Sequence, residues 1–220
     1  MLISLKLSIP LKSVGSGEAA LVIFAFYLTP NFSGDVARSI QPKNLVFIQY
    51  LFALAVVEAC RALDPAKEWA TKVKLKWPND IYGEFPAEET WKSVELKKLG
   101  GILVNTSFER NTVDVIIGTC PLCASRASLW VLKTDPGCGL NVLNEPPIGS
   151  LAQLEALAHG QGASSSLTVE RVTAAVLTAF ERTWNLFLTE ESQGFRPFMD
   201  RYTSSWLHSC VKCLVFWRSL

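Results

Sequence analysis

The stretch that decides the interpretation of this sequence is Lys76-Trp77-Pro78-Asn79-Asp80-Ile81-Tyr82. Apolar residues alternate with lysines over 72–77, which predicts a strand with Trp77 packed on the same face as the other apolar side chains. A proline, an asparagine and an aspartate follow, and these residues are typical of a turn. The turn would present an amide beside a carboxylate, so Asn79 and Asp80 offer oxygen ligands to a hard cation such as magnesium.

A second informative stretch is Lys97-Lys98-Leu99-Gly100-Gly101-Ile102-Leu103. A lysine close to two glycines at the start of a strand places a cationic point charge where the backbone can approach a ligand closely. Taken alone, a lysine near two glycines also fits an ordinary turn, and an Asn-Asp pair also fits a solvated one. Neither stretch identifies a site without the other.

Hydrophobic periodicity divides the rest of the chain into elements. Helical spacing predicts a helix over 44–62 that is apolar almost all round and therefore lies inside the domain. The other predicted elements are strands at 2–11, 101–105 and 112–117, a surface loop at 83–96, and helices at 150–157, from 168 onward and at 195–206. Strands come first and helices later, which indicates the α+β class.

Composition limits the classes of function. Apolar residues make up 49% of the chain and charged residues 19%, which favours a folded domain with a real core. The net charge is only +1, so the composition gives no electrostatic reason to expect a nucleic-acid partner. The apolar run 45–60 contains Gln49 and Glu58, and an ionised glutamate is costly inside a bilayer. We therefore expect a buried core helix, no membrane span and a cytoplasmic protein.

The six cysteines include two Cys-x-x-Cys pairs, at 120/123 and 210/213. Four thiolates would suit a structural zinc ion. The pairs are far apart in the sequence, however, and neither contains a glycine that would help the chain turn around a metal. We therefore expect free cysteines.

Taken together and in this order, the motifs resemble biotin–protein ligases, most closely the eukaryotic, fungal-type branch. The two stretches quoted above are followed by Cys138-Gly139-Leu140-Asn141-Val142 and then by Asn144-Glu145-Pro146-Pro147, as in that family. The resemblance covers roughly residues 1–12, 44–118 and 138–209. It implies a mixed, mostly antiparallel sheet backed by helices, like the core of class II aminoacyl-tRNA synthetases.

The resemblance also implies a two-step reaction. Biotin is activated by ATP, with magnesium, to biotinyl-5'-AMP, and the biotinyl group then passes to a lysine in the biotin-carrier domain of a carboxylase. No covalent enzyme intermediate is involved, so the role of the site is to stabilise charge. The resemblance gives catalytic roles to Lys98 and Asp80 and makes Asp80 the expected magnesium ligand. It gives biotin- or adenylate-binding roles to Lys98, Gly100, Gly101, Asn79 and Asn141.

The sequence departs from the family in three places. Family members carry a Gly-Arg-Gly-Arg-Gly loop before the first matched strand, and no Gly-Arg dipeptide occurs here. Segments 13–43 and 119–137 resemble nothing in the family, and we expect them to be translated introns or, alternatively, lineage-specific loops. The tail 210–220 is also foreign. We therefore expect a catalytic domain over 1–209, truncated at its N-terminus, with adenylation impaired by the missing loop.

Two alternative functions stay open. A lipoate–protein ligase belongs to the same superfamily, although the Lys-Trp-Pro-Asn-Asp-Ile-Tyr form and the Gly-Leu-Asn turn favour biotin. A non-catalytic remnant that binds biotin or a carrier domain is the other alternative, and the missing Gly-Arg-rich loop favours it.

Overall fold

The computed structural model describes residues 42–66, 68–87, 93–109, 112–118, 138–160 and 165–208. Their order along the chain is a 3-10 turn (Pro42–Phe47), α1 (Ile48–Leu63), a 3-10 turn (Ala70–Lys72), β1 (Val73–Lys76), β2 (Asp80–Pro86), β3 (Val94–Glu109), β4 (Thr112–Gly118), β5 (Cys138–Leu140), α2 (Leu151–His159), α3 (Val169–Thr189), two 3-10 turns (Glu191–Gln193 and Arg196–Phe198) and α4 (Met199–Ser204). The α+β class is therefore confirmed.

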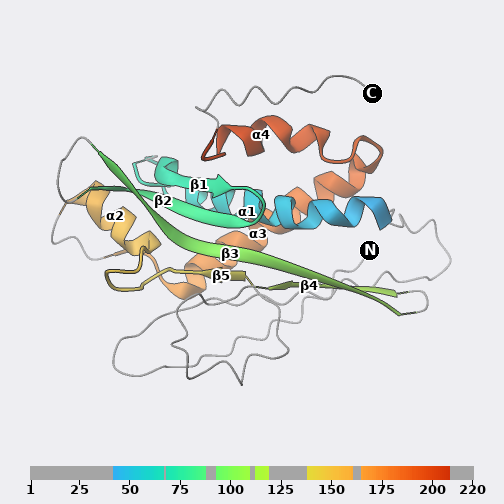
Figure 1. Cartoon of the computed structure of the whole chain (residues 1–220), viewed down its shortest axis with the longest axis horizontal. Helices are drawn as coiled ribbons and strands as arrows, with labels where there is room; N and C mark the ends of the chain where they lie inside the picture. The colour runs from blue at the N-terminus through green and yellow to red at the C-terminus, as the bar shows by residue number, and fades with distance from the viewer. Residues whose placement is uncertain are drawn as a thin grey trace.

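The described strands form one five-stranded sheet in which every strand pair is antiparallel. The order is β1-β2-β3-β4, and β5 pairs with β3. Figure 1 shows β5 and β4 following one another along the same edge of the long strand β3. The one parallel contact is a single bridge between Leu75 and Trp206, so the predicted mostly antiparallel sheet is confirmed.

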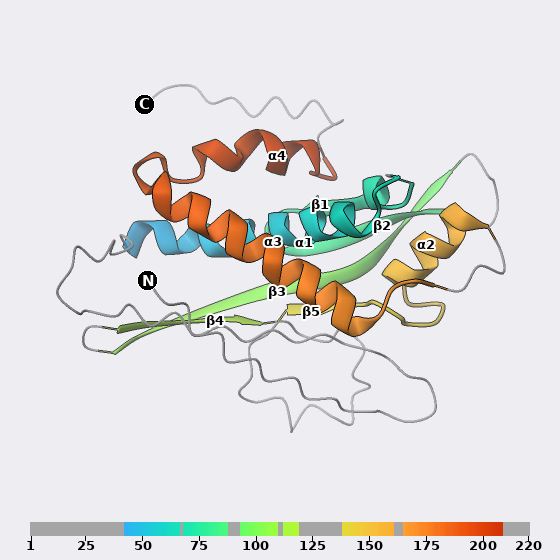
Figure 2. The same ribbon diagram turned by 180° about the vertical axis from the view of Figure 1, so that it is seen from behind.

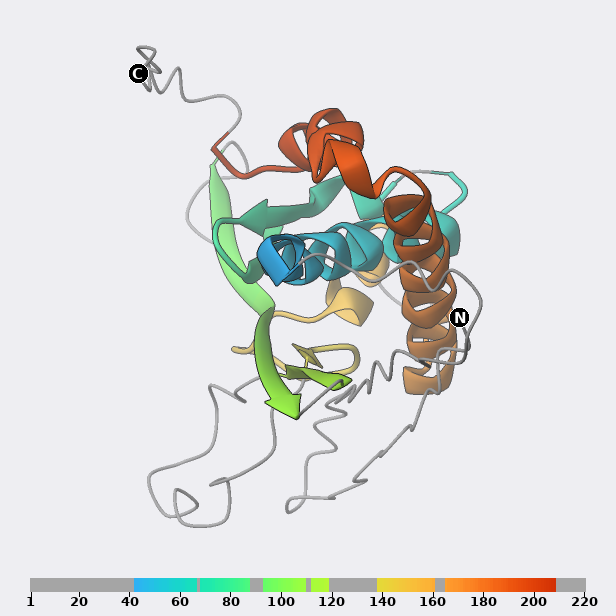
Figure 3. The ribbon, with the colours of Figure 1, turned by 90° about the vertical axis from the view of Figure 1, so that its right-hand side faces the viewer.

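Helices cover one face of this sheet. Burial alternates along β1 and β2, with Val73, Leu75, Ile81 and Phe85 turned inward, as the period of two requires. Helix α1 lies between the sheet and α3, and the view from behind shows α3 crossing α1 (Figures 2 and 3). No described helix covers the opposite face of the sheet (Figure 3).

Helix α1 is a core helix, as its sequence predicts. By length and composition alone, Lys43–Leu63 is the one helix in the described part of the chain that is apolar enough to cross a membrane. In the structure 56% of that segment is buried, and the buried side chains face both the sheet and α3. Burial also raises the pKa of the Cys60 thiol to about 12, so this free cysteine is an unreactive core residue.

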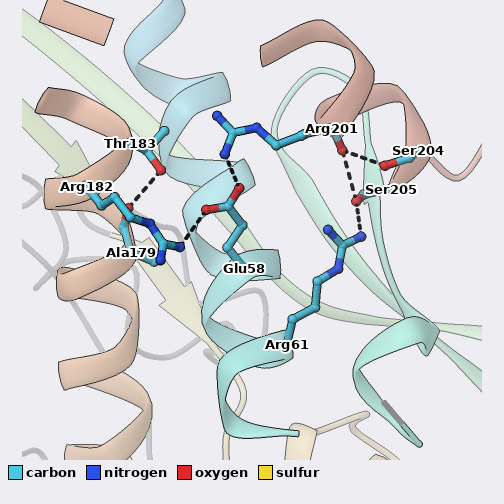
Figure 4. A network of polar contacts seen from close by, with 8 residues as sticks. All are labelled: Glu58, Arg61, Ala179, Arg182, Thr183, Arg201, Ser204 and Ser205. Carbon is cyan, nitrogen blue, oxygen red and sulfur yellow. Dashed lines mark hydrogen bonds and ion pairs between the residues drawn. The ribbon is translucent and has the colours of Figure 1, made fainter. Parts of the chain in front are cut away.

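The carboxylate of Glu58 joins three helices (Figure 4). Its side chain is only 9% exposed and accepts hydrogen bonds from Arg182 of α3 at 3.0 Å and from Arg201 of α4 at 2.8 Å. One turn later, Arg61 donates to the hydroxyl of Ser205 at 2.8 Å. The acidic residue of the apolar helix is thus paired through both carboxylate oxygens, and these bonds attach the C-terminal helices to α1.

The C-terminal end of α4 also reaches the sheet. The amide of Leu75 donates to the carbonyl of Ser205 at 2.8 Å, and the amide of Leu207 donates to the carbonyl of Leu75 at 2.7 Å. These bonds hold the outer edge of β1 just before the chain turns toward Asp80. The ion pairs of Glu58 with Arg182 and Arg201 therefore also support β1, the strand that leads into the turn at Asn79, through α4 and this bridge.

Two predictions about this region are wrong. Residues 83–96 are not one surface loop, because β2 continues to Pro86 and pairs with β3 from Val94 onward. Polar residues dominate there since the hairpin is exposed, while Phe85 still packs inward. Trp77 does not pack with the apolar residues of β1: it is 60% exposed, because the strand ends at Lys76 and the chain turns.

Several predictions lie outside the described residues. They concern the strand at 2–11, the segments 13–41 and 119–137, both Cys-x-x-Cys pairs and the tail 210–220. They stay predictions, as does the division of the chain into a catalytic domain and foreign segments.

Replacing Glu58 by Gln should lower the free energy of unfolding by about 1 kcal/mol, because both ion pairs are lost while each arginine stays partly solvated. Urea unfolding followed by far-UV circular dichroism measures this change. Glu181→Gln is the matched control, since Glu181 is an exposed residue of α3. Equal free energies of unfolding for the two variants would show that the ion pairs of Glu58 do not stabilise the fold.

Candidate functional site

The centre of the site is an ion pair on the face of the sheet that no described helix covers. Lys98 Nζ lies 2.6 Å from Asp80 Oδ1, and the two side chains are 30% and 26% exposed. Asp80 begins β2 and Lys98 belongs to β3. The two residues that the resemblance marks as catalytic are therefore in direct contact, at a distance typical of a charge-assisted hydrogen bond.

A β-bulge makes this contact possible. Asp80 pairs with Gly101 and Tyr82 pairs with Lys98, so three residues of β2 face four residues of β3. In a regular strand, residues three apart point to opposite faces. The extra residue of the bulge, Leu99, is fully buried, and it lets both Lys98 and Gly101 face the same side as Asp80.

Gly101 keeps the space beside this ion pair open, and Gly100 lets β5 approach β3 closely. A Cβ atom on Gly101 would lie 3.2 Å from Asp80 Oδ1 and 3.6 Å from Lys98 Nζ, so it would crowd the ion pair. A Cβ atom on Gly100 would lie 2.2 Å from the carbonyl oxygen of Gly139, which is an impossible contact. Gly101 itself pairs with Gly139 of β5, so two neighbouring strands carry no side chain at this level of the sheet.

Asn79 is fixed in one orientation. Its side-chain amide Nδ2 donates to the main-chain carbonyl of Ile102 at 2.8 Å. The main-chain carbonyl of Asn79 accepts from the main-chain amide of Ile102, also at 2.8 Å. These two bonds attach the turn to β3. Because the bond from Nδ2 fixes the amide group, its oxygen Oδ1, the acceptor of the side chain, is also held in one position.

Asn141 lies on the other side of β3. Its backbone amide donates to the carbonyl of Leu99 at 2.7 Å, and its side-chain Nδ2 is 3.4 Å from the carbonyl of Lys98. Its own carbonyl accepts from the amide of Leu151, the first residue of α2. Asn141 therefore connects the bulge of β3 with the start of α2.

The structure thus brings all of the predicted site residues to one short section of β3 and its neighbours. Lys98, Asp80 and Gly101 share one face, while Asn79, Gly100 and Asn141 hold the strand ends around them. Whether these residues bind biotin and ATP stays a prediction. Their backbone and side-chain bonds explain why the residue types occur at this spacing.

Three residues near the ion pair were not predicted. Tyr82 pairs with Lys98 across the bulge, Lys76 pairs with Asp80 in the register of β1 and β2, and Gly139 pairs with Gly101. Lys76 and Tyr82 lie in the first quoted stretch, and Gly139 lies in the Gly-Leu-Asn turn. The two-residue alternation of a strand predicts on which face of the sheet each side chain lies. Only the register between neighbouring strands shows which of these residues lie next to one another.

A magnesium ion could take few ligands from these residues alone. One carboxylate oxygen of Asp80 is bound to Lys98, which leaves its second oxygen and the side-chain oxygen of Asn79. Among the described residues, no group of three or more His, Cys, Asp or Glu side chains could hold a metal. The donors fit a magnesium ion that is bound mainly through substrate phosphates and water, as is common for nucleotide-bound magnesium.

Gly100→Ala should lower the free energy of unfolding by about 1–3 kcal/mol, because the new methyl group must push β5 away from β3. Gly101→Ala is the matched control, and its cost should stay below about 1 kcal/mol since its methyl group meets only side-chain atoms. Urea unfolding of both variants measures the difference. A Gly100→Ala variant that is as stable as the Gly101→Ala variant would contradict the close approach of β3 and β5.

Comparison with known proteins agrees with the motifs. Residues 32–120 match the model of the Biotin/lipoate A/B protein ligase family. The biotin–protein ligase of Schizosaccharomyces pombe is 29% identical over 205 residues, which cover 90% of this chain and 29% of that protein. Biotin–protein ligase 1, chloroplastic, of Arabidopsis thaliana is 30% identical over 170 residues, covering 76% of this chain and 36% of that protein.

The human biotin–protein ligase is 28% identical over 174 residues, which cover 78% of this chain and 19% of that protein. The chain therefore spans well under half the length of the curated relatives it matches. Among solved structures, the apo structure of biotin protein ligase from Aquifex aeolicus has a TM-score of 0.47 at 20% identity and covers 86% of this chain and 62% of that chain. Residues 32–120 of this chain are thus similar to the Biotin/lipoate A/B protein ligase family.

Proposed function

We propose that this chain is a biotin–protein ligase, which activates biotin with ATP and transfers it to a lysine of a carrier domain. The observation that carries the proposal is the contact between Lys98 and Asp80 beside the Gly100-Gly101 backbone. An ammonium group in this position can offset the repulsion between a carboxylate and a phosphate that must approach one another. The names of the relatives supply the substrate, biotin, and the kind of acceptor, a protein.

In the first step, a carboxylate oxygen of biotin attacks the α-phosphorus of ATP. A new bond forms between that oxygen and phosphorus, the bond from the α-phosphorus to the bridging oxygen breaks, and pyrophosphate leaves with the electron pair. Two anions must meet, so a cation between them lowers the barrier by stabilising charge. Lys98 is the residue that we assign to this role, and Asp80 holds its ammonium group in place.

The nucleotide side of the site contains Asn79, Asp80 and Asn141. Magnesium, when bound with ATP, would neutralise phosphate charge, and the free oxygens of Asp80 and Asn79 are the atoms that would hold it. Asn141 is held beside the carbonyl of Lys98, where its side chain would contact the adenylate. These residues would orient the nucleotide, and none of them needs to form a covalent bond.

In the second step, the ε-amine of the acceptor lysine attacks the acyl carbon of biotinyl-AMP. An amide bond forms, the bond between the acyl carbon and the phosphate oxygen breaks, AMP leaves and a proton is released from the amine. We propose carboxylase carrier domains as the acceptors and the cytoplasm as the compartment. Because the sequence contains no Gly-Arg dipeptide, we also propose that the mixed anhydride is poorly protected from water.

Lys98→Ala should lower the rate of biotinyl-AMP formation about 100-fold or more, because a charge-stabilising cation is removed. The purified chain is incubated with radiolabelled biotin, ATP and magnesium, and biotinyl-AMP is separated by thin-layer chromatography. Lys97→Ala is the matched control: Lys97 is the neighbouring lysine, but it lies against the ring of Phe85 and pairs with Glu95. The control should keep at least half of the activity.

Three results would separate the alternatives. Biotin binding without any biotinyl-AMP would indicate a non-catalytic remnant and would overturn the proposed activity. Preference for lipoate over biotin in a competition experiment would indicate a lipoate–protein ligase. Equal loss in the Lys97 and Lys98 variants would show that the effect comes from β3 as a whole and not from the ammonium group at the site.

A further inference from the structure

Three lysines lie on the sheet face that carries the ion pair, and they differ in their partners. Lys74 Nζ is 4.0 Å from Glu84 Oε1, and Lys98 Nζ is 2.6 Å from Asp80 Oδ1. Lys76 has no carboxylate partner among the described residues, and its ammonium group lies 5.1 Å from the centre of the Tyr82 ring. Among these three lysines, the surplus positive charge is therefore located at Lys76.

The register places this surplus charge beside the site. Lys76 of β1 pairs with Asp80 of β2, and Asp80 pairs with Gly101 of β3. Paired residues of antiparallel strands point to the same face, so Lys76 and Lys98 approach Asp80 from two sides. Neighbouring strands are about 4.8 Å apart, so the backbone at Lys76 lies roughly 10 Å from the backbone of β3. The side chains of Lys76 and Lys98 are long enough for both ammonium groups to reach a ligand between these strands.

The contact with Tyr82 orients Lys76 without using its hydrogen-bond donors. A cation above an aromatic ring is attracted to the ring face but keeps its N–H groups. An ammonium group has three donors and no acceptor, so it is suited to bind several oxygens of a phosphate chain. Lys74 is less suited since Glu84 competes for it.

We propose that Lys76 binds the β- and γ-phosphates of ATP and the pyrophosphate that leaves in the first step. The inference rests on the proposed function for the identity of the nucleotide. In that step the bond between the α-phosphorus and the bridging oxygen breaks, and the negative charge grows on pyrophosphate. Lys98 serves the attacked α-phosphate and the biotin carboxylate, whereas Lys76 serves the leaving group on the far side of Asp80.

The test is a calorimetric titration of the full chain with inorganic pyrophosphate, ATP and AMP, each in the presence of magnesium. Lys76→Gln should weaken binding of pyrophosphate and of ATP about tenfold to 100-fold and leave AMP binding within about twofold. Lys76→Arg should restore pyrophosphate binding at least in part. Lys74→Gln is the matched control: it removes the same charge from the same strand and face, and its pyrophosphate affinity should stay within about twofold.

Each outcome decides for or against Lys76. Equal loss of AMP and pyrophosphate binding in the Lys76→Gln variant would mean a disturbed site and not a phosphate contact. Equal weakening by Lys74→Gln would mean that only the net charge of the face matters. A native chain that binds ATP no better than AMP, or does not bind pyrophosphate, would also overturn the inference.

Failure of the proposed function can be told apart from failure of this inference. The titrations need no turnover and no biotin. If pyrophosphate binding depends on Lys76 but no biotinyl-AMP forms with any variant, the phosphate site stands and the ligase activity does not. If biotinyl-AMP forms at an unchanged rate in Lys76→Gln at low ATP concentration, the ligase activity stands and the role of Lys76 does not.

Discussion

The β-bulge at Leu99 is the constraint on which the site depends. Without the extra residue, the three-residue step from Lys98 to Gly101 would turn one of them into the helical layer. The bulge places the ammonium of Lys98 and the bare backbone of Gly101 on the face of Asp80, and it buries Leu99 completely on the other side. One backbone irregularity therefore joins core packing to the chemistry of the opposite face.

The two faces of the sheet differ in polarity. The inner face is apolar and is packed against α1, whose single acidic residue, Glu58, is paired by Arg182 and Arg201. The outer face keeps charged side chains that are partly solvated, and therefore pays little desolvation cost for holding them there. Because the described helices all lie on one side of the sheet, the described part of the chain leaves the other side open to a ligand of high charge.

Much of this arrangement follows from sequence pattern. The alternation over 72–77 and the apolar run over 44–62 predict β1 and α1, and two quoted motifs contain nearly all of the residues that meet at the site. The ion pair itself could not be predicted, because it depends on cross-strand register and on a bulge that a two-residue period does not reveal. The same limit explains the errors at 83–96 and Trp77: polar residues in an exposed hairpin resemble a loop, and strand periodicity does not show where a strand ends.

Charge balance explains why Lys98, the lysine that we propose binds anionic substrates, already has a carboxylate partner. An unpaired ammonium group that is only 30% exposed would be costly to hold in place, and Asp80 offsets that cost. An incoming carboxylate or phosphate must therefore compete with Asp80, and it gains most when another cation takes up the charge of Asp80. Under the proposed function, magnesium that arrives with the nucleotide would be such a cation, held at the second oxygen of Asp80. Under the proposed function, Asp80 can thus hold Lys98 in position before substrates arrive and still release its ammonium group to them.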